Sequence, residues 1–320
     1  MEYPFSFVAQ GNIAELRAYL IKADIGIVDE RGNSLLHHAI KYNQTEIFQY
    51  LIENSIDINI QNDDGETPLM QCVFYNRVGF LKELIRLNAN HLLTNKSGET
   101  PFYKACFLGR GLIISLFIEK SLQTMDCKNN NDENIFFALL RAQNVTLFDY
   151  FAKEDKDFIN SVNYFDETLL HVAVKLNSYD LVEYLLKNKA FVNAKNKAKE
   201  TPLFYATKYG NSDIFGLLVQ YGAIIELHNS YDETLLDVVD YQNFIEYIND
   251  KQNSVQYRNY IKDFPLHVAI IKEDVYLVEQ LLINVYIDLE DSFGYKPLDL
   301  ALQLKNKEII NLINEIKNKI

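Results

Sequence analysis

The six histidines are the first side chains that could do chemistry, as general bases or as metal ligands. Three of them, His37, His171 and His267, follow a Leu in one recurring motif. A histidine that recurs in this way is best interpreted as a buried imidazole that hydrogen-bonds the backbone of the next loop. The other three histidines are His38, His91 and His228. They match no metal-ligand spacing, so the sequence predicts no metal site and no cofactor.

Cysteines and other nucleophiles give no catalytic pattern. Cys72 and Cys106 occupy adjacent small-residue positions of predicted first helices, where a thiol serves as a core residue, whereas Cys127 falls in a connection. Three cysteines without a CxxC pair cannot form a disulfide framework, which favours a reduced, cytoplasmic location. No Ser–His–Asp or Cys–His–Asn set stands outside the recurring motif, and no Gly-rich phosphate loop occurs. We therefore expect a protein that is not an enzyme.

A regularly spaced row of carboxylates is more informative. Six consecutive copies of the motif carry Glu at one position, and the next copy carries Asp263. The six are Glu66, Glu99, Glu133, Glu167, Glu200 and Glu233. One interpretation is local, because a carboxylate just before a helix gains from the helix dipole, by ~0.3–1 kcal/mol. The other interpretation is an acidic face along the molecule that binds a basic partner.

The recurring motif repeats with a nearly constant period along the chain. Gly65–Leu69, Gly98–Phe102 and Lys199–Leu203 are near copies of Gly-Glu-Thr-Pro-Leu, and weaker copies extend the series. The position of Thr falls at residues 34, 67, 100, 134, 168, 201, 234, 264 and 296, with intervals of 30 to 34 residues. Thr or Ser is a helix N-cap, Pro suits the first helical position, and Gly two residues earlier suits a turn with positive φ. Asp is tolerated in place of that Gly, because Asp adopts positive φ more readily than most residues, whereas Lys199 and Lys262 fit poorly and mark weaker turns.

Each unit is predicted to contain two helices and a short extended connection. Apolar residues recur at helical spacing in second segments such as 46–52, 180–186 and 276–282. Alternating segments such as 56–60 and 190–194 suggest brief β-arms between units. No unit of this size buries a core alone, so neighbours must stack. The fourth and seventh units depart from the motif, and we expect weaker stacking or a bend at both.

The repeated residues resemble those of the ankyrin-repeat family. The resemblance is carried by Asp63–Leu69, by Leu170–Ala173 and by Ala190–Asn193, and it extends from about Phe5 to the end of the chain. It implies an all-α solenoid of helix-turn-helix units with short β-hairpin connections. We expect one domain over 1–320, with an N-terminal cap over 1–28. Repeats are expected to start near 29, 62, 95, 129, 162, 196, 229, 259 and 291, and the last acts as the C-terminal cap.

The resemblance also implies where a partner binds. In this family, hairpin tips and first-helix faces line a concave groove. Aromatic residues at such places would be interface anchors, although packing between repeats is an equally good explanation. The tip candidates are Tyr164, Phe165, Tyr231, Tyr260 and Phe293. The first-helix candidates are Tyr42, Tyr75, Tyr205 and Tyr209.

Composition excludes other classes of function. The chain has 320 residues and a formal charge of −13, so it should repel nucleic acid. No apolar run reaches the ~20 residues of a membrane helix, and the first ten residues show no secretory signal. We expect a monomeric, cytoplasmic scaffold or adaptor that binds a basic protein or peptide. Alternatives are a bacterial effector in a host cytosol, an inhibitor or immunity-type protein, and, less favoured, an enzyme with its site in a degenerate unit.

Overall fold

The structure, a computed structural model, describes residues 4–154, 157–209, 211–224, 229–231, 264–271, 273–282, 287–290 and 295–318. The chain divides into two compact units, Met1–Val172 and Ala173–Ile320. The division falls inside one helix, α11 (Leu169–Lys175). The expectation of one continuous domain over 1–320 stays a prediction.

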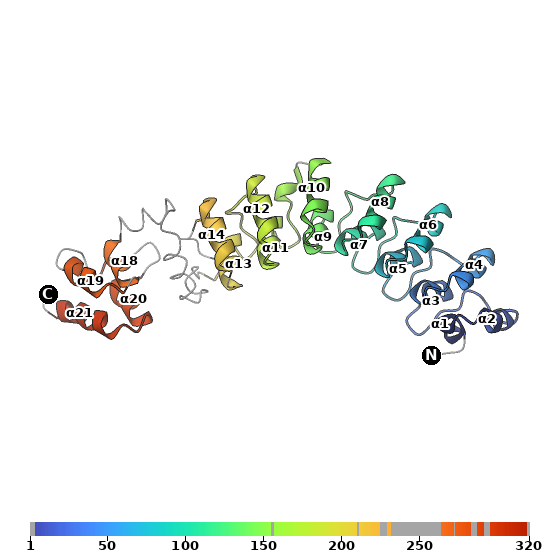
Figure 1. Cartoon of the computed structure of the whole chain (residues 1–320), viewed down its shortest axis with the longest axis horizontal. Coiled ribbons are helices and arrows are strands. Elements are labelled where there is room, and N and C mark those ends of the chain that lie inside the picture. The colour runs from blue at the N-terminus through green and yellow to red at the C-terminus, as the bar shows by residue number, and fades with distance from the viewer. Residues whose placement is uncertain are drawn as a thin grey trace. The chain divides into compact units, whose positions relative to one another are not determined.

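The first unit consists of helix pairs joined by short turns (Figure 1). First helices pack on first helices in chain order, α1 on α3, α3 on α5, α5 on α7 and α7 on α9. The helices are α1 (Phe5–Gln10), α2 (Ile13–Leu20), α3 (Leu35–Lys41), α4 (Thr45–Glu53), α5 (Pro68–Phe74), α6 (Val78–Arg86), α7 (Pro101–Phe107), α8 (Gly111–Glu119), α9 (Ile135–Arg141), α10 (Val145–Glu154) and the 3₁₀ turn η1 (Asp157–Asn160).

The second unit repeats the same pairing of helices. Here α12 packs on α14, α18 on α20 and α19 on α21. Its helices after α11 are α12 (Tyr179–Lys187), α13 (Pro202–Lys208), α14 (Ser212–Gln220), α18 (Pro265–Ile271), α19 (Val275–Leu282), α20 (Pro297–Gln303) and α21 (Lys307–Lys317). The predicted seventh repeat, near 229–258, lies almost entirely outside the described residues, so the count of nine repeats stays a prediction.

The predicted N-caps explain where the first helices begin. The hydroxyls of Ser34, Thr67 and Thr100 each accept a hydrogen bond from the backbone N–H three residues later. In the degenerate fourth unit Asn134 accepts from the N–H of Phe136 instead. Thr201 was expected to act in the same way, but its buried hydroxyl has no hydrogen-bond partner. The helix after Thr201 therefore relies on Pro202 at its first position.

The predicted turns are confirmed where the structure describes them. Gly32, Gly65 and Gly98 have φ values of 73°, 75° and 78°. A Cβ at Gly65 would lie 2.8 Å from the backbone nitrogen of Lys96, which belongs to the next repeat. At other copies of this position the left-handed conformation is adopted by Asp132 and Lys199, both with φ near 58°. Positive φ alone therefore does not require Gly at this position, whereas the close approach of the next turn leaves no room for a Cβ at Gly65.

The connections are turns and not the extended arms that alternation suggested. In the described residues, the β-type pairing consists of two isolated bridges, Val28 with Ser34 and Val162 with Thr168. Residues 56–60 and 190–194 form turns with no strand. Neighbouring tips are instead joined by single backbone bonds, such as Asp63 N to Arg31 O and Lys96 N to Asp64 O, both 2.9 Å. These bonds hold successive turns of the first unit in register.

The fourth unit is well packed despite its departure from the motif. Six of the seven residues of α9 are buried. Phe136 stacks on Phe158 of η1 with 4.0 Å between ring centroids, and Phe148 of α10 meets both rings edge-on. The extra ring from η1 fills space in the core that the altered motif leaves.

Candidate protein-binding surface

An asparagine organises each tip turn. In the third repeat, Asn95 Oδ1 accepts hydrogen bonds from the backbone N–H groups of Ser97 and Glu99, at 3.0 and 2.9 Å. Because one side chain satisfies two turn donors, it fixes the turn in the manner of an Asx-turn. The same pair of bonds is made at Asn62, Asn129, Asn163 and Asn196, and by the carboxylate of Asp29 in the first repeat.

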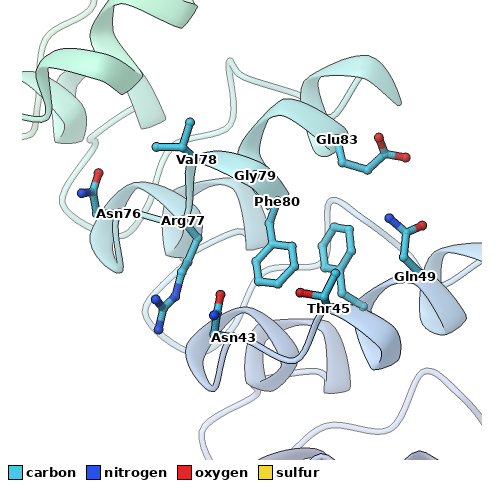
Figure 2. Close-up of a pocket in the computed structure, with 10 residues that line it drawn as sticks. Asn43, Thr45, Gln49, Asn76, Arg77, Val78, Gly79, Phe80 and Glu83 are labelled. Atoms are coloured by element: carbon cyan, nitrogen blue, oxygen red, sulfur yellow. The ribbon is translucent and has the colours of Figure 1, made fainter.

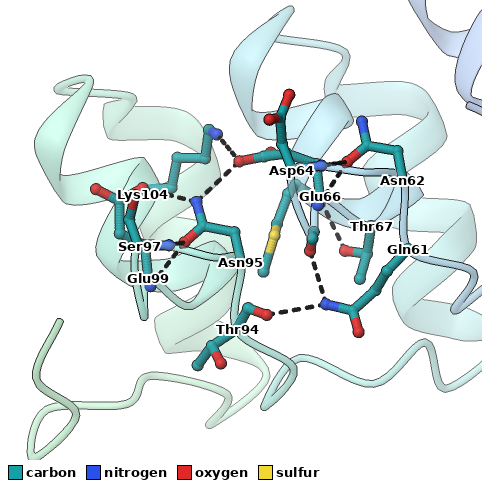
Figure 3. Close-up of polar contacts among 12 residues, drawn as sticks. Gln61, Asn62, Asp64, Glu66, Thr67, Thr94, Asn95, Ser97, Glu99 and Lys104 are labelled. Carbon is teal, nitrogen blue, oxygen red and sulfur yellow. Dashed lines mark hydrogen bonds and ion pairs between the residues drawn. The ribbon is translucent and has the colours of Figure 1, made fainter. Parts of the chain in front are cut away.

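These asparagines also hold the glutamate row. Asn95 Nδ2 donates to Glu99 Oε2 within its own repeat and to Glu66 Oε1 of the preceding repeat, both at 2.9 Å (Figure 3). The ammonium of Lys104 forms an ion pair with the same oxygen of Glu66, and both side chains are largely buried. Lys104 also lies over the ring of Phe74, 5.7 Å from its centroid. Glu66 is therefore a structural link between the second and third repeats.

Glu133 is the centre of a second cluster. Its side chain is 4% exposed, and Oε1 lies 2.6 Å from Nη2 of Arg141. Oε2 accepts from Asn129 Nδ2 at 3.0 Å and from the hydroxyl of Tyr103, in the preceding repeat, at 3.3 Å. Burial is the largest cause that raises the pKa of Tyr103, and the charge of Glu133 adds to it. Tyr103 is therefore protonated and acts as the donor across the repeat boundary.

The structure corrects the expectation of an acidic outer face. Glu66, Glu133 and Glu167 are buried, and Glu99 and Glu200 are half-buried. All five have hydrogen-bond partners within the chain. Because three of the five carboxylates are buried and all five accept hydrogen bonds within the chain, the row has a reduced capacity for an outside partner. One buried oxygen, Oε2 of Glu66, has no hydrogen-bond partner. Glu233 and Asp263 lie outside the described residues.

The recurrent histidines have the structural role that the sequence predicts. His37 Nε2 lies 3.0 Å from the carbonyl oxygen of Glu66, and His267 Nε2 lies 2.8 Å from that of Tyr295, each in the next repeat. Burial lowers the pKa of His37, so the imidazole is neutral. Tyr103 occupies the equivalent position in the third repeat and reaches the next repeat through its hydroxyl instead.

His38 forms an interaction that its sequence position did not suggest. Its Nε2 atom lies 2.8 Å from Asp29 Oδ2, and its ring contacts Phe5 of the N-terminal helix pair at 4.8 Å between centroids. Burial raises the pKa of Asp29, but hydrogen bonds from His38 and Asn33 outweigh it and lower the value to about 2. Burial lowers the pKa of His38 despite this neighbour. A neutral imidazole therefore donates to an ionised carboxylate. Among the described residues, no group of three His, Cys, Asp or Glu side chains could hold a metal ion.

The aromatic candidates separate into exposed and buried residues. At the tips, Tyr164, Phe165 and Tyr231 are 60%, 52% and 76% exposed. Tyr164 and Phe165 pack edge-to-face with 5.4 Å between centroids, and the N–H of Tyr164 donates to the carbonyl of Asn131 at 2.7 Å. This tip is thus a fixed pair of exposed rings. Tyr260 and Phe293 lie outside the described residues.

The first-helix candidates differ from one another. Tyr209 is exposed, whereas Tyr42 and Tyr75 are half-buried. Tyr205 is buried and hydrogen-bonded through its hydroxyl to Asn196 Nδ2 at 3.2 Å. Tyr205 therefore belongs to the interior, and its assignment as a partner-binding residue was wrong.

Comparison with protein families identifies the repeats. The family described as ankyrin repeats (3 copies) matches residues 5–95, 75–196 and 125–229. These matches together span most of the chain. The chain belongs to the ankyrin-repeat family. None of the curated proteins compared with the chain matches it.

Membership supports the broad expectations about function. Ankyrin repeats are generally protein–protein interaction modules, and the family is typically non-catalytic. Among the described helices, none is long and apolar enough to cross a membrane.

Two features of the ankyrin repeats were missed from the sequence. The first is the asparagine series, which was readable as Asn five positions before the Thr marker at Asn62, Asn95, Asn129, Asn163 and Asn196. The second missed feature is Phe107, at the last position of α7, which is 39% exposed. Its position, seven residues after the marker, was the available signal.

Proposed function

We propose that this ankyrin-repeat chain is a non-catalytic scaffold or adaptor that binds a protein partner through its turn tips and first-helix face. The observation that supports this most is the tip pair Tyr164 and Phe165, both more than half exposed while held edge-to-face. Large aromatic side chains that are already ordered cost little conformational entropy when a partner covers them.

The proposed partner has a basic surface or presents a basic peptide. The buried glutamates do not supply the acidic character for this role. Exposed aspartates at the tips do so instead, namely Asp63, Asp64, Asp132 and Asp166. Asp166 directly follows the aromatic pair, and the whole chain carries a net charge of −13. Arg and Lys side chains interact favourably with aromatic faces and with carboxylates, so rings and aspartates together suit a cationic segment.

The proposed location is the cytoplasm, with the chain as a monomer. A bacterial effector that acts on host proteins would work in the host cytosol. An inhibitor or immunity-type protein that blocks a basic surface is the alternative function, and no described feature favours it over an adaptor. An enzyme with its site in the fourth or seventh repeat is less favoured.

Affinity capture followed by mass spectrometry tests the proposal, with wild type compared to the Tyr164→Ala/Phe165→Ala variant. The Tyr276→Ala variant is the matched control, because Tyr276 is 73% exposed in α19 and is not at a tip. We expect the control to retain the wild-type partner and the tip variant to lose it, with unchanged thermal stability in both. Retention of the same partner by the tip variant would contradict the proposal.

A further inference from the structure

The outer face of helix α8 differs in composition from those of its neighbours. Its residues Gly111–Glu119 include one charged side chain, Glu119, and Leu112 is 72% exposed. At the position of Leu112, α4 and α12 carry Glu46 and Asp180, whereas the adjacent α6 and α10 carry Gly79 and Thr146. An exposed helix face in a solvated solenoid is normally polar, so an apolar one indicates a surface that is covered.

A groove whose lining residues are half apolar lies between α8 and α10. It has a volume of about 620 Å³. Ile114 and Ile118 line it from α8, while Leu147 and Tyr150 line it from α10. On each helix these residues are three or four positions apart, so the apolar side chains follow the groove for about one turn.

The ring of Phe102 contacts a ring on each of the two helices. It packs edge-on against Phe117 of α8 at 5.9 Å and against Phe151 of α10 at 6.0 Å. A side chain from the first-helix layer thus packs against both second helices. Between α4 and α6, by contrast, Phe48 and Phe80 stack directly on each other at 4.5 Å.

The α4–α6 groove provides an internal comparison (Figure 2). Its volume is about 390 Å³, and its lining includes Asn43, Asn76, Arg77 and Glu83. Arg77 is already engaged, because its Nε and Nη2 atoms donate to the carbonyls of Ile40 and Lys41. Arg77 thereby ties this groove into the stack, whereas no arginine lines the α8–α10 groove, whose polar lining residues are Ser115, Glu119, Asn144 and Thr146.

We infer that the groove between α8 and α10 is a second docking site, and that it binds a basic amphipathic helix of a partner protein. Two parallel rows of apolar residues one turn apart match the i, i+3, i+4 and i+7 anchors of a helix. The charged side chain in the lining is Glu119, and no basic residue lines the groove. Glu119 contacts Lys120 in an exposed ion pair, 3.0 Å long, which a cation of the partner can replace at little cost.

A second copy of this chain fits the groove less well than a basic helix. Two copies with 13 net negative charges each repel one another. The site is independent of the turn tips, so the proposal does not rest on the function proposed above.

The test uses a designed peptide and exploits the absence of tryptophan from the chain. The probe is a helical Leu/Lys peptide of about 18 residues with one Trp among its apolar anchors. Its emission should shift to shorter wavelength on addition of protein and should saturate at one peptide per chain. A Leu/Glu peptide with the same apolar pattern should bind at least tenfold more weakly.

A matched pair of variants locates the binding. Ser115 lines the groove and is exposed, so Ser115→Arg and Ser115→Glu should both fold. We expect Ser115→Arg to weaken binding of the Leu/Lys peptide roughly fivefold and Ser115→Glu to retain it. Gln220→Arg, on the exposed side of α14, makes the same change in net charge and should bind as wild type.

Three results would overturn the proposal. Equal affinities of the Ser115→Arg and Gln220→Arg variants would place the peptide elsewhere. Equal binding of the Leu/Glu peptide would remove the basic requirement. A dimer in light scattering that Ser115→Arg dissociates would show that a second copy occupies the groove.

Discussion

The side-chain amide of Asn95 donates a hydrogen bond to the carboxylate of Glu66 in the preceding repeat, with 2.9 Å between Nδ2 and Oε1. The same amide donates to Glu99 in its own repeat. In this way, a residue that shapes one turn also connects two repeats. The first repeat reverses the roles, because Asp29 supplies the carboxylate and Asn33 supplies the amide. In the third to sixth repeats the tip asparagine donates to the glutamate of its own repeat, whereas Asn62 in the second repeat donates to Asn33 Oδ1.

The first prediction concerns the effect of a negative charge at position 95. Asn95→Asp preserves shape but replaces an amide donor with a second carboxylate beside Glu66 and Glu99. We expect the free energy of unfolding to fall by about 2 kcal/mol or more, because like charges meet where burial is high. Urea denaturation measures the change. Asn131→Asp, at an exposed tip position, is the matched control and should alter stability little; equal losses in both variants would contradict the account.

A second prediction compares two glycines. Gly65→Ala places a Cβ 2.8 Å from the backbone of the next repeat at a φ of 75°. We expect it to lower the free energy of unfolding by about 1–3 kcal/mol. Gly79→Ala, in α6 with no atom within 4 Å of the new Cβ, should be neutral or stabilising by about 0.5–1 kcal/mol. Thermal melts of the two variants should shift in opposite directions, and a parallel shift would show that close approach of the turns is unimportant.

Tyr103→Phe tests the hydrogen bond across the third and fourth repeats. The change removes the donor to Glu133 and the acceptor of Asn129 but keeps the ring in the core. We expect a loss of about 1 kcal/mol in the free energy of unfolding. Tyr75→Phe is the control. Tyr75 is half-buried, and removing its hydroxyl leaves the bond between Tyr103 and Glu133 in place. An unchanged free energy of unfolding in the Tyr103→Phe variant would show that the hydrogen bond from Tyr103 to Glu133 does not stabilise the fold.

The fourth prediction concerns pH. Burial lowers the pKa of His37 and of His38 below 6.5, although Asp29 opposes the shift at His38, whereas Lys41 adds to it. The unfolded chain therefore binds protons first as the pH falls below about 6.5, and stability should decrease from there. Asp29, with a pKa of about 2, stays ionised in this window and loses its contribution only below about pH 4.

Measurements of the melting temperature as a function of pH test whether stability falls as the pH falls. The His38→Gln variant should show a smaller decrease between about pH 7 and pH 5 than wild type, because one buried titrating group is gone. His91→Gln, in a turn, is the matched control. If His38→Gln retains the full decrease, His38 is not a source of the pH dependence.

Local chemistry explains which parts of the fold could be predicted from sequence. Thr67 and Pro68 start a helix through bonds and torsions within a few residues, and Gly65 marks a left-handed turn for equally local reasons. The histidine bonds were also predictable, because a buried imidazole at a repeated position needs a repeated partner. In contrast, the prediction of extended arms was wrong. Alternation of apolar residues over only five positions also occurs in a turn whose side chains are partly buried.

The candidate site was harder to predict because exposure depends on neighbouring repeats. The glutamate row precedes helix N-termini as expected, yet Glu66 is buried only because Asn95 and Lys104 of the next repeat cover it. Tyr205 and Tyr209 lie four residues apart on or beside one helix, but Asn196 holds only the first inside. Spacing alone could not distinguish these outcomes.

We propose that the carboxylate row stabilises the stack of repeats, whereas the exposed aromatic side chains at the tips bind the partner. The most direct test measures melting temperature and partner capture together for Glu133→Ala and for Tyr164→Ala/Phe165→Ala. We predict a lower melting temperature with retained capture for Glu133→Ala, and an unchanged melting temperature with lost capture for the aromatic variant. The reverse pattern, with capture lost in a fully stable Glu133→Ala protein, would contradict the claim.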